Sequence, residues 1–189
     1  MKSNDNSLKK IKILVLGKPS VGKSTMIKEL MGQPDANLGE QKEFSLNLNV
    51  DDINFELLLS ENTFENFENE DINDFDGFLL VYGVDDRDSF NQVKKSHQLI
   101  VQKKGIKKFG LIIVANKSEI STERKVPKEE GERYCMETNV DFFEVSCIDK
   151  NNVKECFLSI SQKILKFKYP EIFEKQKQNN SDTSWCFCY

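Results

Sequence analysis

The stretch that decides the fold of this chain is residues 11–25, which read IKILVLGKPSVGKST. An apolar run ends at Gly17, a short loop follows, and a helical pattern begins near Lys23. The loop has the form G-x-x-x-x-G-K-[ST], which binds the phosphates of a nucleotide when it joins a strand to a helix. Its glycines let backbone N–H groups approach phosphate oxygens, and the helix start adds a favourable dipole. The stretch therefore predicts a nucleotide site.

Two side chains of this loop have specific expected roles. Lys23 is expected to reach the β- and γ-phosphates as a point charge, and the Ser24 hydroxyl is expected to ligate Mg²⁺. The predicted nucleotide-binding residues of the loop are Gly17, Lys18, Pro19, Ser20, Val21, Gly22, Lys23, Ser24 and Thr25.

The composition fits one intracellular domain. A chain of 189 residues is long enough for a sizeable core, and its net charge of −4 argues against a general nucleic-acid binder. The five cysteines have no ladder of close spacings, which favours reduced thiols. Cys135 and Cys156 fall in apolar periodic segments, so we expect them to be buried. No apolar run is long enough to span a membrane, and residues 1–9 are expected to form a disordered arm.

Strand and helix patterns alternate through residues 10–168, which we expect to form the folded domain. Strands are predicted at 44–50, 53–59, 77–84, 109–115 and 141–145, besides the run before Gly17, and helices near 88–105, from Pro127 and over 151–167. This alternation predicts an α/β fold with a mostly parallel six-stranded sheet and helices on both faces. Ligands of such sheets bind at the carboxyl ends of the strands, where the loops after Gly17, Ala115 and Val145 lie.

Two features have competing interpretations. The acidic segment 60–76 carries Phe64, Phe67 and Ile72, which could form the apolar side of a short irregular helix. Its acidity indicates either a partner surface or a merely solvated face. His97, the only histidine, is flanked by lysines and is expected to be a surface residue without a catalytic role.

The loops after the last two strands indicate which nucleotide binds. Asn116-Lys117-Ser118-Glu119 follows one strand, and Ser146-Cys147 follows the other. Together with FLLVY (78–82), DRDSF (86–90), EEG (129–131) and FFEVS (142–146), these motifs resemble the Ras-like small GTPases from about Lys10 to Phe167. The resemblance implies the P-loop NTPase fold, GTP or GDP with Mg²⁺ as ligands, and effector or regulator proteins as partners. It also implies that Asn116 and Lys117 frame the guanine ring and that backbone N–H groups of the Ser146-Cys147 loop cap its O6.

Glu119 stands where the family usually has aspartate, the carboxylate that accepts hydrogen bonds from guanine. Its extra methylene moves the oxygens further out, so we expect guanine preference to survive with weaker affinity. The alternative is that Glu119 is simply a surface acid of the loop.

The two switch segments depart further from the family. No threonine lies between Thr25 and Thr63 to supply the metal ligand expected from the first switch. Residues 60–64, SENTF, occupy the place of Asp-x-x-Gly-Gln, which puts Phe64 where the family has glutamine, and Pro19 replaces a loop glycine. We therefore expect very slow hydrolysis and little contrast between the GTP and GDP forms. An alternative keeps Glu61 or Ser60 as a substitute Mg²⁺ partner.

Residues 169–189 are expected to form a flexible tail ending in a prenylation frame. Cys186 is fourth from the end, as in C-a-a-X, although Phe187, Cys188 and Tyr189 are poor choices for the last three places. One lipid holds a protein weakly, so a second signal from Cys188, Trp185 or nearby lysines is required. The alternative is an unmodified aromatic tail.

Two classes of function follow from these features. The first is a membrane-tethered, monomeric Ras-like GTPase with slow intrinsic hydrolysis, at the cytoplasmic face of a membrane, most naturally the plasma membrane. The second is a pseudo-GTPase interaction module that binds nucleotide with little or no turnover. An ATP-using enzyme is disfavoured because no further catalytic constellation is present.

Overall fold

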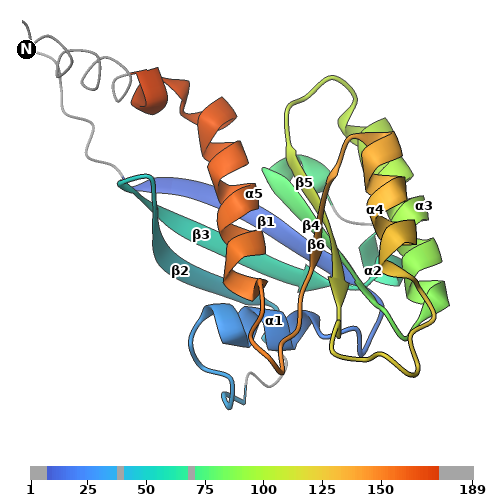
Figure 1. Ribbon diagram of the computed structural model, residues 1–189. Coiled ribbons are helices and arrows are strands. Elements are labelled where there is room, and N and C mark those ends of the chain that lie inside the picture. Colours follow the sequence, from blue (N-terminus) through green and yellow to red (C-terminus); the bar gives the residue numbers. More distant parts are fainter. Residues whose placement is uncertain (1–7, 38–40, 68–70, 175–189) are drawn as a thin grey trace, which may run out of the picture.

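Within the residues that this computed structural model describes (8–37, 41–67 and 71–174), six strands form one sheet in the order β2-β3-β1-β4-β5-β6 (Figure 1). The β2–β3 pair is antiparallel and every other pair is parallel. The predicted mostly parallel α/β sheet is therefore confirmed. The strands are β1 (Lys9–Gly17), β2 (Glu43–Val50), β3 (Ile53–Asn62), β4 (Gly77–Gly83), β5 (Gly110–Asn116) and β6 (Asp141–Glu144).

Helices cover both faces of the sheet. α1 (Lys23–Leu30) and α5 (Val153–Lys168) pack on one face, and α3 (Arg87–Lys104) and α4 (Lys128–Thr138) pack on the other (Figure 1). Each face has its own apolar cluster, and the predicted burial of Cys135 and Cys156 is confirmed. β4 is buried at every residue, as expected for a central strand with a continuous apolar sequence.

The acidic segment after β3 is held down by its apolar residues, as predicted. It forms the single turn α2 (Phe64–Phe67) and the 3₁₀ turn η1 (Ile72–Asp74). Phe67 and Ile72 are buried against the α3 face of the sheet. The buried ammonium of Lys104 at the end of α3 also donates to the Phe75 carbonyl, at 2.6 Å. Both ends of the described part of this segment are therefore anchored.

The chain beyond α5 stays in contact with the domain as far as it is described. The Tyr169 hydroxyl donates to the Lys10 carbonyl at 3.1 Å, and Ile172 and Phe173 pack against the core. Residues 169–174 are thus packed, whereas the sequence predicted a flexible tail from 169. Cys186 and the rest of the tail lie outside the described residues. Among those that are described, no helix has the length and apolar character needed to cross a membrane.

The prediction that His97 lies on the surface was wrong, because it belongs to the buried stripe of α3. Its side chain is only 6% exposed, and its Nδ1 lies 2.9 Å from the Tyr134 hydroxyl. The buried positions of this stripe recur every three or four residues, the helical period: Phe90, Val93, His97, Ile100 and Lys104. The lysines on either side of His97 in the sequence concealed this pattern.

Burial of His97 should make the stability of the protein depend on pH. Desolvation lowers the pKa of His97 below its ordinary value of 6.5. At mildly acidic pH the unfolded chain therefore binds a proton that the folded protein excludes, so stability falls as pH falls below about 6.5. The loss is at most about 1.4 kcal/mol per pH unit. Urea unfolding at about pH 7.5 and 5.5 measures it, and His97→Gln should reduce the difference. An equal loss in the variant would contradict this role.

Candidate nucleotide-binding site

The predicted motifs meet at one edge of the sheet. β4 lies between β1 and β5, with Gly17 opposite Val81 and Gly83 opposite Asn116. The loops that follow β1, β4 and β5 are therefore neighbours at the carboxyl ends of the strands, where parallel sheets bind ligands.

The phosphate loop after β1 requires glycine at both of its fixed positions. A Cβ on Gly17 would lie 2.6 Å from the Val81 carbonyl oxygen, and one on Gly22 would lie 2.1 Å from Asn116 Nδ2. Gly22 also has a left-handed backbone, with φ of 96°, as does Ser20, two residues before it, with φ of 65°. Pro19, Ser20 and Thr25 are exposed on this loop and the first turn of α1.

Lys23 is curled back over this loop. Its Nζ donates to the carbonyl oxygens of Gly17 at 3.0 Å and Lys18 at 2.9 Å, and its side chain is 5% exposed. Burial lowers the pKa of Lys23, and the Glu61 carboxylate 3.8 Å away partly offsets that effect. A buried ammonium that has one carboxylate within ion-pair distance among the described residues is suited to bind the oxygens of an anion.

Ser24 meets a carboxylate from β3. Its hydroxyl donates to Glu61 Oε1 at 2.9 Å. Two neighbouring ligands of an octahedral Mg²⁺, with bonds of about 2.0–2.1 Å, are about 2.9 Å apart. The Ser24–Glu61 pair therefore has the oxygen chemistry and the spacing of a magnesium site. The described part of the chain contains no group of three or more His, Cys, Asp or Glu side chains placed to hold a metal by themselves.

The motif after β5 contacts the phosphate loop directly. Asn116 is buried and donates through Nδ2 to the Val21 carbonyl at 2.8 Å, across 95 residues of sequence. Lys117 has a left-handed backbone, with φ of 65°, and its Nζ lies 2.9 Å from Asp85 Oδ2. Glu119 Oε2 is buried and has no hydrogen-bond partner among the described residues. An unpaired buried carboxylate oxygen is costly, so this atom fits a ligand that brings N–H donors.

The loop after β6 completes the site. The Ser146 N–H donates to the Asn151 carbonyl at 3.2 Å, so in this structure it is not free to cap a base, and the expected role of Cys147 stays a prediction. The Cys147 thiol lies 3.5 Å from Asn116 Oδ1. Burial raises the pKa of Cys147 to about 11, so the thiol is neutral at physiological pH.

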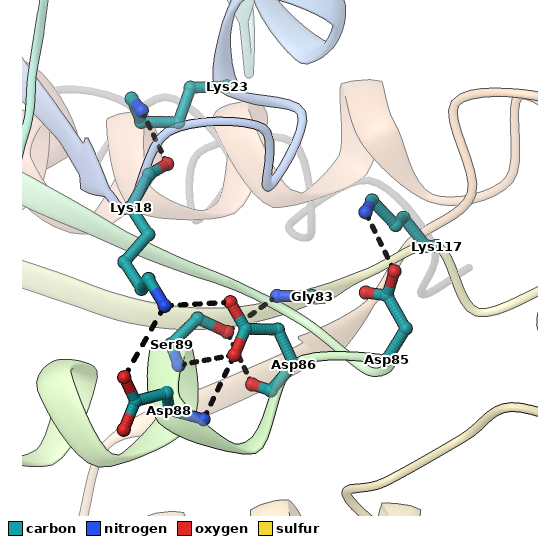
Figure 2. Close-up of polar contacts among 8 residues, drawn as sticks. All are labelled: Lys18, Lys23, Gly83, Asp85, Asp86, Asp88, Ser89 and Lys117. Atoms are coloured by element: carbon teal, nitrogen blue, oxygen red, sulfur yellow. Dashed lines mark hydrogen bonds and ion pairs between the residues drawn. The ribbon is translucent and has the colours of Figure 1, made fainter.

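The side chain of Lys18 is directed away from Lys23, toward the start of α3. Its Nζ lies 3.2 Å from Asp86 and 3.5 Å from Asp88, as Figure 2 shows. The Lys18 side chain therefore makes an ion-pair contact that the sequence analysis missed, and its expected part in nucleotide binding stays a prediction. The available signal was the Asp85-Asp86 pair directly after a buried strand.

Comparison with known proteins decides the family. A model of the Ras family matches residues 12–166. The chain belongs to the Ras family. It is 29% identical over 164 residues to GTP-binding protein Rheb homolog 1 of Caenorhabditis elegans, covering 83% of this chain and 79% of that protein. It is 27% identical over 188 residues to Ras-like protein rasU of Dictyostelium discoideum, covering 96% of this chain and 88% of that protein. It is 33% identical over 96 residues to human R-Ras, covering 51% and 44%.

The side-chain alternation of β3 favours a different register for the Ras-family second switch from the one expected. The residues of β3 that face α1 and α5 are Phe55, Leu57 and Leu59, and the same alternation continues to Glu61. Glu61 accepts the hydrogen bond from the Ser24 hydroxyl, which favours Glu61, and not Ser60, at the place of the Asp in Asp-x-x-Gly-Gln. Phe64 then takes the place of the glycine and Glu65 that of the glutamine. The geometry thus favours the alternative in which Glu61 is the Mg²⁺ partner, and the match of Phe64 to glutamine stays the competing prediction.

Proposed function

We propose that this Ras-family protein binds GTP and GDP with Mg²⁺ at the site described above and hydrolyses GTP very slowly. The observation that carries the proposal is the hydrogen bond from Asn116 Nδ2 to the Val21 carbonyl, because it joins the base-recognition motif to the phosphate loop in one site. The unpaired Glu119 oxygen supports guanine, whose N1–H and exocyclic amine are donors that adenine lacks in that arrangement.

The slow hydrolysis follows from the second switch. Phe64 supplies a bulky residue where a glycine is usual, and it packs with Phe67 against the α3 face. Glu65 is exposed in the place of the water-orienting glutamine, and its carboxylate cannot donate a hydrogen bond as an amide can. The second candidate, a nucleotide-bound interaction module without useful turnover, is favoured by this anchoring, since an anchored segment responds little to the γ-phosphate.

Calorimetry with nucleotide-free protein tests the binding. We expect one GDP per chain with Mg²⁺ present, similar uptake of GTP, and no competition by a large excess of ATP. No uptake of GDP or GTP at millimolar concentration would contradict the proposal.

An acidic surface beside the second switch is the proposed partner site. A cavity of about 550 Å³ lies at β1, the start of β2, the end of β3 and the α2–η1 region. It is lined by four acids, Glu43, Glu61, Asp71 and Asp74, and by two lysines, Lys12 and Lys42. The excess of acids favours a basic partner segment. Crosslinking of this surface to a co-purified protein, with Asp71→Lys as the variant that loses it, tests the assignment.

Replacing Glu61 with glutamine should weaken metal binding while the hydrogen bond from Ser24 to residue 61 is kept. Glutamine keeps a hydrogen-bonding oxygen for Ser24 but loses the charge that attracts Mg²⁺. We expect the free Mg²⁺ concentration that half-maximally slows release of a fluorescent GDP to rise about tenfold or more. Ser60→Ala is the matched control, because Ser60 lies on the opposite face of β3 and should leave the titration unchanged. If the half-maximal Mg²⁺ concentration rose in Ser60→Ala and not in Glu61→Gln, Ser60 would stand in the place of the aspartate, as the sequence analysis expected.

The membrane tether rests on the sequence of the tail. We propose that Cys186 carries a prenyl group and that the protein acts as a monomer on the cytoplasmic face of a membrane. Lys168 and Tyr169 join the end of α5 to the start of β1 through the Lys10 carbonyl. Flotation on liposomes of protein from eukaryotic cells should place the wild type with lipid and Cys186→Ser in the soluble fraction. Equal flotation of Cys186→Ser and a Cys188→Ser control would contradict the proposal.

A further inference from the structure

The connection from β4 to α3 contacts both halves of the nucleotide site. Because β4 lies between β1 and β5 in the sheet, the loop that follows it lies between the phosphate loop and the Asn116-Lys117 motif. Three carboxylates, Asp85 and Asp86 of this connection and Asp88 of the first turn of α3, face two lysines, one from each neighbouring loop (Figure 2). We call these three aspartates the acidic turn.

On the phosphate-loop side, Asp86 holds Lys18. Its Oδ2 lies 3.2 Å from Lys18 Nζ, and its Oδ1 accepts the N–H groups of Asp88 at 3.0 Å and Ser89 at 3.2 Å, which caps α3. Burial acts to raise the pKa of Asp86, but the Ser89 N–H and Lys18 lower it below its ordinary value, so the carboxylate is charged. Asp88 is a weaker partner, at 3.5 Å with a side chain 75% exposed.

On the guanine side, Asp85 holds Lys117. The Nζ–Oδ2 distance is 2.9 Å, and both side chains are partly buried. The second carboxylate oxygen of Asp85, Oδ1, is buried without a hydrogen-bond partner among the described residues. A Cβ on Gly83 would lie 2.4 Å from this oxygen, so glycine leaves the space that the carboxylate occupies. The Lys117 ammonium is thus the group that compensates a costly buried charge.

The two aspartates sit on one rigid frame. The Gly83 N–H donates to Ser89 Oγ at 3.1 Å, and that hydroxyl donates to the Asp86 carbonyl at 2.6 Å. The Val84 N–H donates to the Asn116 carbonyl at 3.0 Å, which ties the frame to the end of β5. A displacement of either lysine therefore acts on the same short segment.

We propose that the acidic turn is a clamp that fixes the phosphate loop relative to the guanine-recognition loop and so slows the release of bound nucleotide. This inference rests on the proposed nucleotide binding. Asp85 and Asp86 act through Lys117 and Lys18 and are positioning residues. Among the described residues, the ion pairs of the clamp involve the loops after β1, β4 and β5 and the start of α3, and not the two switch segments, so we expect it to act in either nucleotide state.

Asp86→Asn separates the charge from the helix cap, because asparagine also caps helices well and keeps an accepting oxygen for the Asp88 and Ser89 N–H groups. We expect release of a fluorescent GDP to be about two- to fivefold faster in Asp86→Asn, the range of an exposed ion pair, and about tenfold faster in Asp85→Asn. Lys18→Met should match Asp86→Asn, and the double variant should be no faster than either. Raising salt from about 0.05 to 0.5 M should speed release from the wild type and have little effect on Lys18→Met.

Glu132→Gln is the matched control, since it removes an exposed ion pair with Lys128 on α4, away from the site, and should release GDP at the wild-type rate. Hydrogen–deuterium exchange of residues 17–25 in nucleotide-free protein gives a readout independent of binding. If residues 17–25 exchange faster than the wild type in Asp86→Asn and at the wild-type rate in Glu132→Gln, the clamp is supported even if the protein fails to bind GDP. Unchanged exchange together with unchanged GDP release, or equal salt acceleration in Lys18→Met, would overturn it.

Discussion

Replacing Glu119 with leucine should weaken GDP binding by at least about 100-fold and remove the preference for guanine over adenine. The reason is the carboxylate itself, whose Oε2 is buried and has no hydrogen-bond partner in the described part of the chain, so we expect it to accept from the donors of the base. A hydrogen bond to a charged group contributes about 1.5–3 kcal/mol, so losing two corresponds to a factor of roughly 10²–10⁴ in affinity. Competition of a fluorescent GDP by unlabelled GDP and ATP measures both the affinity and the preference.

The matched variant is Glu119→Asp, which keeps the charge and shortens the side chain by one methylene. We expect it to bind GDP about tenfold more tightly than the wild type, because a shorter carboxylate has the reach that the family usually provides, and correct placement of an acceptor is what rejects adenine. GDP binding by Glu119→Leu at wild-type strength would mean that Glu119 is only a loop acid, and base recognition would then rest on Asn116 and Cys147.

The sheet and the positions of the ligand loops could be predicted from the sequence because their signals are local. The continuous apolar run of β4 is buried at every residue, and Gly17 and Gly22 occupy positions where any Cβ would collide with a neighbour. Such constraints act within a few residues of the chain. They identify the strand and the phosphate loop before any tertiary contact is known.

The missed features depend on contacts between distant segments. Ser60 and Glu61 are neighbours at the end of β3, and their side chains point to opposite faces of the sheet. Which of them stands in the place of the family's aspartate therefore depends on which face meets the phosphate loop. Glu61 shares its face with Leu59, and only the contact with Ser24, 37 residues away, shows what that face meets. The Lys18–Asp86 pair likewise links segments that the sequence keeps apart.

The double variant Phe64→Gly, Glu65→Gln should hydrolyse GTP on the order of 10²-fold faster than the wild type, which we expect to show almost no phosphate release in a single turnover. Glycine restores a flexible backbone at the place that contacts the γ-phosphate. Glutamine restores an amide whose oxygen can accept a hydrogen bond from water and whose NH₂ group can donate one to phosphate. Single-turnover release of phosphate from preloaded protein measures the rate.

The single variants separate the two possible registers. If Glu61 takes the place of the aspartate, Phe64→Gln alone should have little effect, whereas Glu65→Gln alone should raise the rate by part of the full increase. The opposite result, acceleration by Phe64→Gln only, would return Ser60 to the aspartate position. Because Phe64 packs in the α3-facing cluster, thermal unfolding of each variant with GDP bound serves as the control for loss of the fold.

An arginine finger supplied by an activating protein distinguishes a switch from an interaction module. Such a finger adds roughly 10³–10⁵ in rate, but only where water and γ-phosphate are already positioned. In the protein with its natural second switch, we expect Pro19→Gly to leave the rate of GTP hydrolysis with an activating protein unchanged. In the Phe64→Gly, Glu65→Gln background we expect Pro19→Gly to raise that rate strongly. The reason is that an exposed proline at position 19 obstructs the finger, which matters only when the rest of the site can position water. Strong activation of the unaltered protein would show instead that Glu65 orients water as it stands, and the chain would then be a working switch.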